Sequence, residues 1–210
     1  MMGSHKREAG RRAPRQTLTD WARARAAGVL APLARWLGRL GVRANTITAV
    51  GFLLQLGVSA LFVTERLRWG GVLLSLVAPL DALDGAVARA TGSDGPFGAF
   101  LDSTLDRLSD AALILSLAAY QFRLGALTEG TLFLGALVLS LMVSYTRARA
   151  EALGVGCTVG LATRLERVLL IAVLSTLGLV KILAWVLALL SLITFLQRMV
   201  HVYRACSQQD

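Results

Sequence analysis

Long apolar runs are the feature that most constrains what this chain can fold into. Six such runs follow one another along the sequence, at 44–64, 70–90, 98–121, 128–149, 161–180 and 182–203. About 20 apolar residues are what a helix needs to cross the hydrocarbon core of a bilayer. A soluble all-α protein, the alternative, rarely repeats runs of this length. We therefore expect an all-α integral membrane protein with six transmembrane helices.

Basic residues gather at one set of helix ends. Residues 1–43 hold ten lysines and arginines against Glu8 and Asp20. With six spans, the connections near 91–97 and 150–160 and the C-terminus fall on the same side as this segment. Of the 22 basic residues, those on the other side are Arg66, Arg68, Arg123 and Lys181. The positive-inside rule then predicts a cytoplasmic N-terminus in a multi-pass protein of the cell (plasma) membrane.

The net charge of +9 indicates contact with the anionic surface of a membrane, which agrees with this topology. Anionic lipid headgroups attract basic segments at a membrane surface, and no nucleic-acid motif accompanies the charge. We expect a flexible basic tail over 1–17, then an amphipathic interfacial helix over 18–42, where apolar residues recur at helical spacing between arginines. The six-helix domain is expected over 43–204, and a short C-terminal tail over 205–210.

The predicted membrane domain contains carboxylates, whose burial at membrane depth is energetically unfavourable. The segment DALDGAVARATGSDGPFGAFLDSTLD, residues 81–106, holds five of the 13 acidic residues. Asp81 and Asp84 are three apart and Asp102 and Asp106 are four apart, so each pair shares one face of a helix. The sequence ATGSDGPFG between the pairs is typical of a turn, which brings both pairs to the same end of the bundle.

Four converging carboxylates repel one another strongly where the dielectric constant is low. Mg²⁺ or Mn²⁺ prefers hard oxygen ligands and offsets such charge. The sequence therefore predicts a site for two metal ions at these four aspartates. The alternative is that the aspartates pair with local arginines and only stabilise the bundle.

The spacing of this segment resembles the signature of the CDP-alcohol phosphotransferases, D-x2-D-G-x2-A-R-x8-G-x3-D-x3-D. Its fixed positions are met by Asp81, Asp84, Gly85, Ala88, Arg89, Gly98, Asp102 and Asp106. The resemblance covers roughly 28–204 and includes GVRANTIT, which is similar to the family's entry motif G-V-T-P-N-x-x-T. In this chain Ala44 replaces the proline of that motif.

The resemblance implies a six-helix, homodimeric membrane enzyme whose active site opens to the cytoplasmic side. It implies that the hydroxyl of an acceptor attacks CDP-diacylglycerol or an ether-lipid analogue and that CMP leaves. In this family pattern Asp81, Asp84 and Asp102 are metal ligands, and Asp106 is the catalytic base that also touches metal. The residues implied to bind the CDP-lipid are Arg43, Ala44, Asn45, Thr46, Gly85, Arg89, Ser93, Gly95 and Gly98.

Arginines near the same helix ends predict the second substrate. They are Arg147, Arg164, Arg167 and Arg198. Arginine suits bidentate recognition of phosphate, which indicates a phosphorylated acceptor, although arginines at helix ends also snorkel to the membrane surface. These segments resemble the phosphatidylinositol-phosphate synthases of bacteria and their archaeal ether-lipid counterparts, which implies inositol 1-phosphate as the acceptor.

Three alternatives remain at this point. A phosphatidylglycerophosphate synthase also needs an anion pocket, for glycerol 3-phosphate. A cation transporter uses intramembrane carboxylates as an ion path, but those carboxylates would be spread along a route. An aspartate-rich membrane prenyltransferase would have two separate aspartate motifs, and this sequence has one cluster.

Overall fold

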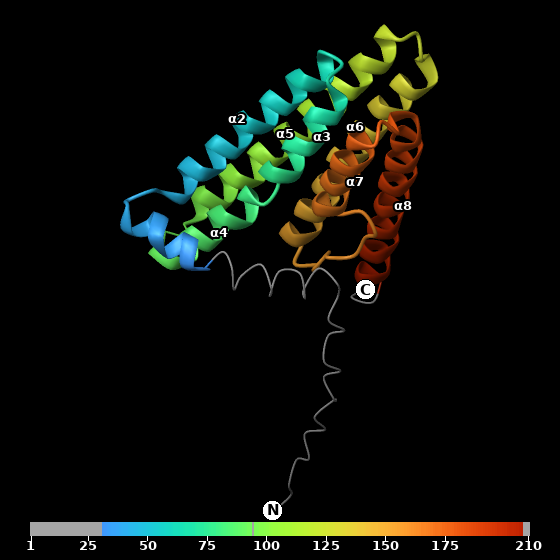
Figure 1. The fold of residues 1–210 in the computed structure, drawn as a ribbon. Coiled ribbons are helices and arrows are strands. Elements are labelled where there is room, and N and C mark those ends of the chain that lie inside the picture. The colour runs from blue at the N-terminus through green and yellow to red at the C-terminus, as the bar shows by residue number, and fades with distance from the viewer. Residues whose placement is uncertain (1–30, 94, 208–210) are drawn as a thin grey trace, which may run out of the picture.

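The computed structural model describes residues 31–93 and 95–207, and the regular elements in these ranges are all helices (Figure 1). They are α2 (Ala44–Val63), α3 (Leu67–Val77), α4 (Leu80–Thr91), α5 (Pro96–Arg123), α6 (Leu127–Ala152), α7 (Arg164–Thr176) and α8 (Val180–Cys206). Residues 31–39 are also helical. The predicted tail at 1–17, the part of the predicted amphipathic helix at 18–30 and residues 208–210 lie outside the described residues. The all-α class is confirmed.

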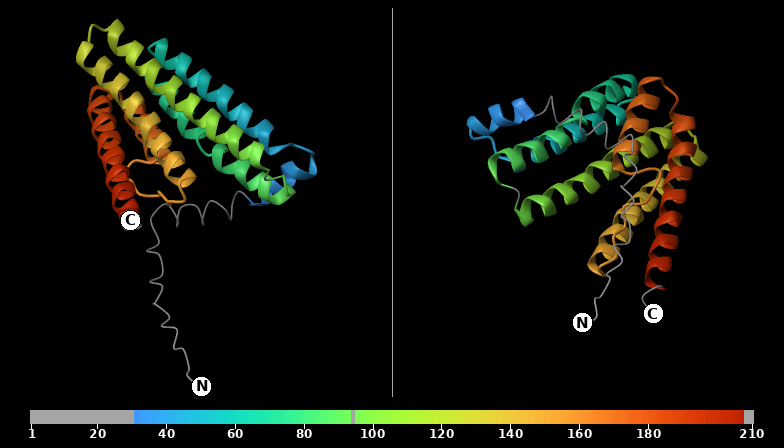
Figure 2. Two further views of the ribbon diagram at one scale, coloured as in Figure 1. Left: turned by 180° about the vertical axis from the view of Figure 1, so that it is seen from behind. Right: turned by 90° about the horizontal axis from the view of Figure 1, so that it is seen from below.

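The helices run between two ends of the molecule (Figure 1). The start of α2, all of α4, the start of α5, the end of α6, the start of α7 and the end of α8 lie at one end. The tight connections that follow α2, α5 and α7 lie at the other. The views from behind and from below show the same arrangement (Figure 2). The segments that carry the predicted site residues therefore share one end of the fold.

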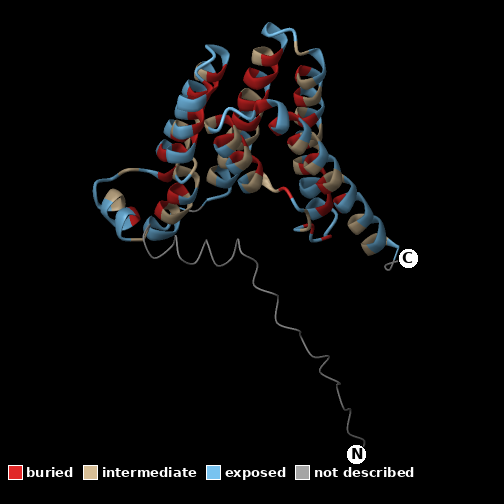
Figure 3. Cartoon of the chain, turned by 45° about the vertical axis from the view of Figure 1, so that its right-hand side comes forward, coloured by how far each residue is buried: buried red, intermediate tan, exposed pale blue. Residues whose placement is uncertain are grey.

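The packing places α5 between α2 and α6, α8 against α6, and α3 against α7. The main core contains fully buried side chains from several helices, among them Phe62, Leu74, Leu117, Phe133 and Leu187. Buried residues line the inward faces, and many outward faces are exposed (Figure 3). Large apolar side chains also lie on the outside, each more than half exposed; examples are Leu53, Trp69, Leu76 and Trp185. Such outer faces suit contact with lipid.

Four of the described helical segments are long and apolar enough to cross a membrane. They are Ala44–Val63, Leu67–Thr91, Leu127–Ala152 and Val180–Cys206. The predicted span 98–121 corresponds to α5, which has 28 residues but carries aspartates and an arginine in its first half. The predicted span 161–180 corresponds to α7, whose 13 residues reach only about 20 Å. Four of the six predicted spans thus meet both criteria.

The second predicted span, 70–90, consists of two helices. Helix α3 ends at Val77 and α4 begins at Leu80, with Ala78 and Pro79 between them. Proline has no N–H to continue the hydrogen-bond ladder, and its ring disfavours a straight helix. After the break, α4 packs on α2 while α3 packs on α7. The break therefore sets the direction of the helix that carries the first aspartate pair.

The contact between α3 and α7 is close at Gly71. A Cβ atom there would lie 2.6 Å from both the carbonyl oxygen of Ala172 and the backbone nitrogen of Thr176. These are backbone atoms that cannot move aside, so only glycine fits. The close approach seats α7 against the α3 side of the bundle, and α7 begins with an arginine of the predicted site.

Candidate active site

Both predicted aspartate pairs lie at the same end of the fold. Asp81 and Asp84 are on α4, and Asp102 and Asp106 are in the first turns of α5. Gly92 closes α4 in the left-handed conformation, with φ of 64°, and Pro96 starts α5, so the chain reverses over a few residues. One side chain, that of Arg164 on α7, contacts both Asp81 of α4 and Asp106 of α5. The short connection thus brings both aspartate pairs to the same end of the fold.

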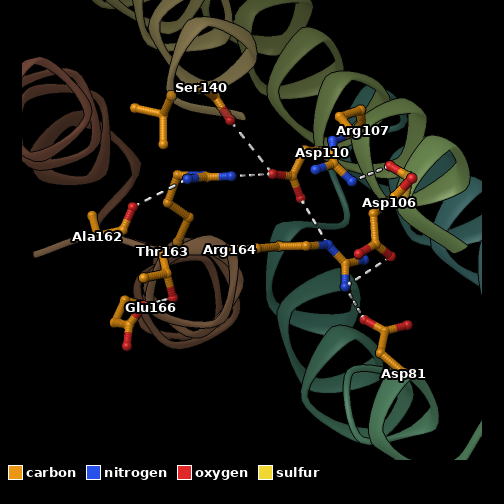
Figure 4. A network of polar contacts seen from close by, with 12 residues as sticks. Asp81, Asp106, Arg107, Asp110, Ser140, Ala162, Thr163, Arg164 and Glu166 are labelled. Atoms are coloured by element: carbon orange, nitrogen blue, oxygen red, sulfur yellow. Dashed lines mark hydrogen bonds and ion pairs between the residues drawn. The ribbon is translucent and has the colours of Figure 1, made fainter. Parts of the chain in front are cut away.

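The guanidinium of Arg164 lies between the two helices that carry these aspartates (Figure 4). Its Nη1 contacts Oδ2 of Asp81, and it lies 3.1 Å from Oδ1 of Asp106. The side chains of Asp81 and Asp106 are 28% and 20% exposed. The sequence interpretation assigned Arg164 to the acceptor pocket and did not foresee this contact. The aspartate pairs and the first arginine of α7 therefore form one site.

The donor atoms of this site fit a divalent cation. Within residues 31–93 and 95–207, no three acidic, cysteine or histidine side chains stand at the spacing of one metal ion. The Arg164 guanidinium contacts both Asp81 and Asp106. The same carboxylates nevertheless share one positive charge, that of Arg164, from two separate helices. Hard carboxylate oxygens of this kind are the ligands that Mg²⁺ and Mn²⁺ prefer.

Asp84 is oriented by α2. The hydroxyl of Thr48 donates a hydrogen bond of 2.7 Å to Oδ2 of Asp84, and the N–H of Gly85 donates to Oδ1. Asp84 is only 6% exposed, so its charge depends on these two donors. Thr48 was not among the predicted site residues, although it is the last position of the GVRANTIT motif. Its hydroxyl restricts the orientation of the Asp84 carboxylate.

The start of α7 places two arginines on one face. Thr163 is the N-terminal cap residue, and its hydroxyl donates to the Glu166 carboxylate. The order Thr-x-x-Glu is typical of a helix start. Arg164 and Arg167 follow three positions apart in the first turn. The N-terminus of a helix favours negative charge, so this turn is suited to an anion.

The connection before α7 is anchored on α8. The Oγ1 of Thr194 accepts a hydrogen bond of 3.0 Å from the N–H of Ala162, and the Oε1 of Gln197 accepts one of 3.2 Å from the N–H of Leu161. Arg198 donates to the carbonyl oxygen of Val159 at 3.0 Å. These contacts fix the path of the chain into α7. They join residues more than 30 positions apart, and no local sequence signal indicates them.

The other two predicted arginines lie beside this connection. Arg198 is 4% exposed and also donates to the carbonyl oxygen of Val143 at 2.6 Å. Arg147, in the last turns of α6, is half exposed and pairs with Glu151 at 2.7 Å. Arg198 therefore holds α6 and the connection together, whereas Arg147 presents its guanidinium to the surface.

The residues predicted for the CDP-lipid lie around the starts of α2 and α5 and on α4. Arg43 is exposed and caps α2, and Gly95 caps α5. A Cβ atom at Gly98 would lie 3.2 Å from Oδ1 of Asn45, and one at Gly85 would lie 3.4 Å from Nη1 of Arg89. Ala44 is buried, Thr46 is exposed, and the hydroxyl of Ser93 lies 2.7 Å from that of Thr91. The two glycines thus keep space beside polar groups.

One acidic residue escaped the sequence interpretation. Asp110 follows Asp106 by four residues, so it extends the same face of α5 by one turn. It is 5% exposed and pairs with Arg167 at 2.7 Å. The spacing of Asp102, Asp106 and Asp110 was a readable signal, but the family signature ends at Asp106.

The residues of this site lie within the region that is similar to known proteins. The family model described as CDP-alcohol phosphatidyltransferase matches residues 42–197. The archaetidylinositol phosphate synthase of Pyrococcus horikoshii is 44% identical over 167 residues, which is 79% of this chain and 86% of the relative.

Two solved structures of the phosphatidylinositol phosphate synthase of Mycobacterium tuberculosis are similar over most of the chain. The structure with CDP-DAG bound has a TM-score of 0.78 and 31% identity, covering 83% of this chain and 94% of that one. The structure in complex with manganese and citrate has a TM-score of 0.76 and 31% identity, covering 83% of this chain and 88% of that one.

Proposed function

Because the chain belongs to the CDP-alcohol phosphatidyltransferase family, we propose that it transfers a phosphatidyl group, or its ether-lipid equivalent, to inositol 1-phosphate. The donor is a CDP-linked lipid and the products are a phosphatidylinositol phosphate and CMP. The observation that carries the proposal is the meeting of the α4 and α5 carboxylates with the first-turn arginines of α7. The named relatives, synthases of archaetidylinositol phosphate and of phosphatidylinositol phosphate, support the same acceptor.

The reaction is a displacement at phosphorus. The acceptor hydroxyl oxygen bonds to the β-phosphorus of the CDP-lipid, and the bond from that phosphorus to the bridging oxygen breaks, so that CMP leaves with the bridging oxygen. The hydroxyl proton passes to Asp106, which acts as the general base. Its partial exposure supports this role, because a base must come within hydrogen-bond reach of the hydroxyl.

Asp81, Asp84, Asp102 and Asp106 would hold two Mg²⁺ or Mn²⁺ ions. When bound, such ions neutralise the diphosphate and stabilise the CMP leaving group. The four carboxylates meet at one site, and Thr48 and Gly85 orient Asp84 there. The manganese in the solved relative supports the choice of metal.

The CDP part of the donor would lie beside this metal site. Arg43, Ala44, Asn45 and Thr46 begin α2, Gly85 and Arg89 belong to α4, and Ser93, Gly95 and Gly98 flank the start of α5. The small side chains let a diphosphate approach both helices. The relative with CDP-DAG bound supports such a donor.

The acceptor phosphate would bind among Arg147, Arg164, Arg167 and Arg198. Buried N–H groups support this assignment: in the described ranges, Nη2 of Arg164 and Nε of Arg167 lack a hydrogen-bond partner. Buried donors without partners are costly, and a phosphate would satisfy them in bidentate fashion. The positive end of α7 adds to the attraction.

The protein is a multi-pass membrane protein, as its apolar helices and its family indicate. We place six spans in the plasma membrane, with α5 and α7 as the third and fifth, and with the N-terminus and active site on the cytoplasmic side. The distribution of charge supports this orientation, since Arg66, Arg68, Arg123 and Lys181 lie at or near the connections opposite the site. The expected homodimer remains a prediction, which cross-linking in native membranes would test.

The function is tested by CMP release from CDP-diacylglycerol in the presence of Mg²⁺ or Mn²⁺. Inositol 1-phosphate and glycerol 3-phosphate are offered in parallel, and an ether-lipid donor is run beside the ester. We expect turnover with inositol 1-phosphate. Turnover with glycerol 3-phosphate alone would overturn the proposed acceptor and keep the reaction type. CMP release with neither acceptor and neither donor would contradict the proposed function.

Replacing Arg147 by alanine is expected to raise the KM for inositol 1-phosphate about tenfold and to leave the KM for the CDP-lipid unchanged. One charge-assisted contact with the phosphate, about 1.4 kcal/mol, corresponds to this factor. Arg147 is half exposed, so its loss should not disturb the fold. Arg68→Ala, at the opposite end of the bundle, is the control that should change neither KM. An unaltered acceptor KM in Arg147→Ala would remove this residue from the pocket.

A further inference from the structure

Asp110 is a fifth aspartate beside the four predicted ones, and each of its two oxygens faces a different arginine (Figure 4). Oδ2 accepts a hydrogen bond of 2.7 Å from Nη2 of Arg167 and one of 3.4 Å from the hydroxyl of Ser140. Oδ1 lies 3.5 Å from Nε of Arg164. The side chain of Asp110 is 7% exposed. This one carboxylate on α5 thereby connects α6 and α7.

The buried pair of Asp110 and Arg167 has a structural consequence for the start of α7. The side chains of Asp110 and Arg167 are both almost fully buried, at 7% and 3% exposure. Removing one partner of a buried ion pair strongly destabilises the folded protein, because the other charge is left uncompensated. Arg167 also donates to the carbonyl oxygen of Ala162 at 3.1 Å, in the connection that leads into α7. The pair therefore fixes the first turn of α7 against α5.

Arg164 is held from two sides. Its Nη1 lies between Asp81 and Asp106, and its Nε faces Asp110 from the interior side. The distance of 3.5 Å from Nε to Oδ1 is an electrostatic contact that is too long for a good hydrogen bond. In the part of the chain that the structure describes, Nη2 of Arg164 and Nε of Arg167 have no hydrogen-bond partner and do not face Asp110 as an ion-pair contact. Asp110 thus attracts both guanidinium groups without using all of their donors.

We propose that Asp110 is a positioning residue for the acceptor: it holds Arg164 and Arg167 so that their remaining N–H groups face the acceptor phosphate. Asp110 itself touches neither substrate and acts through the two arginines. This inference rests on the proposed function, since it assigns a phosphorylated acceptor to these arginines. It also gives a reason for a buried aspartate beyond the last position of the family signature.

The test is Asp110→Asn in the full-length protein, purified in detergent. Asparagine keeps the shape of the side chain and removes the charge that both guanidinium groups share. We expect the KM for the phosphorylated acceptor to rise at least tenfold, with the KM for the CDP-lipid within twofold of wild type. Equal changes in both KM values, or unchanged acceptor kinetics, would overturn the proposal.

A double-mutant cycle with Arg164→Gln separates positioning from general stability. If Asp110 acts through Arg164, Asp110→Asn adds little to the acceptor KM of Arg164→Gln. Fully additive effects would contradict this. Ser140→Ala, which removes only the 3.4 Å contact, is the matched control and should change the acceptor KM less than threefold. A purely structural role would lower the thermal midpoint of Asp110→Asn without a selective change in the acceptor KM.

Failure of the proposed function would be seen separately. If the wild type releases CMP with glycerol 3-phosphate instead, the same comparison applies, because both acceptors carry a phosphate. If the wild type turns over neither acceptor, the positioning role of Asp110 is tested by measuring the binding of inositol 1-phosphate by calorimetry. Binding to the wild type that is weakened at least tenfold in Asp110→Asn would support the positioning role, and absent or unaltered binding would overturn it.

Discussion

Replacing Asp106 by asparagine is expected to reduce turnover at least a hundredfold while CDP-lipid binding stays near that of the wild type. A carboxamide has almost the same shape as the carboxylate but cannot take the proton of the acceptor hydroxyl. General-base catalysis by a positioned side chain typically contributes 10²–10⁴-fold. CMP release measures the turnover, and equilibrium binding of CDP-diacylglycerol measures the donor affinity.

The control for Asp106→Asn is the same change at a distant carboxylate. Glu65 is half exposed and pairs with Arg123 at 3.3 Å, at the end of the bundle opposite the site. Glu65→Gln should therefore retain wild-type turnover. Near-normal turnover in Asp106→Asn would remove Asp106 from the role of base. Loss of donor binding together with turnover would instead assign it mainly to the metal site.

Replacing Asp84 by asparagine is expected to weaken Mn²⁺ binding at least a hundredfold and to remove most of the turnover. Asp84 is only 6% exposed, and its carboxylate is one of the proposed metal ligands. Loss of its charge removes a direct ligand in a site of low dielectric constant. Mn²⁺ binding, followed by electron paramagnetic resonance of the detergent-solubilised protein, measures the effect without relying on activity. Unchanged Mn²⁺ affinity would exclude Asp84 as a ligand.

Thr48→Val in the same series should have a smaller effect of the same kind. Valine keeps the shape of threonine and loses the hydroxyl that donates to Asp84 at 2.7 Å. Groups that orient a metal ligand typically contribute 10–100-fold to metal affinity, so we expect about a tenfold loss. Thr64→Val is the control, because the hydroxyl of Thr64 bonds only to carbonyl oxygens of its own helix, at 2.9 and 3.2 Å. Equal Mn²⁺ affinity in both threonine variants would contradict an orienting role for Thr48.

These predictions share a physical basis in the division of charge at one end of the bundle. The carboxylates on α4 and α5 repel one another, and Arg164 already supplies positive charge from α7. Asp110 and Arg167 form an ion pair further along α5, where both side chains are buried. In the proposed arrangement the aspartates of α4 and α5 hold the metal ions, and Asp110 keeps the arginines of α7 in place for the acceptor.

Local periodicity was enough to predict the class of the fold and the location of the two aspartate pairs at one end of it. The apolar runs indicated membrane helices because hydrogen bonding inside each segment is what a bilayer requires. The aspartates could be paired by their spacing of three and four residues, since this places side chains on one helical face. The short turn before Pro96 then brought Asp84 and Asp102 to one end. Pro79 was also a readable signal, because proline in the interior of a helical run interrupts the helix.

Only the tertiary structure decided which side chains meet between helices that are distant in the sequence. Thr48 and Asp84 are 36 positions apart, and Asp110 and Arg167 are 57 apart. No spacing rule relates such residues, because their contact depends on how each helix is rotated and how deeply it is set against its neighbours. That register is fixed by interdigitating side chains and by close approaches such as the one at Gly71. The sequence by itself therefore determined the helices and the aspartate cluster, whereas packing determined that Asp110 and Arg164 belong to the same site.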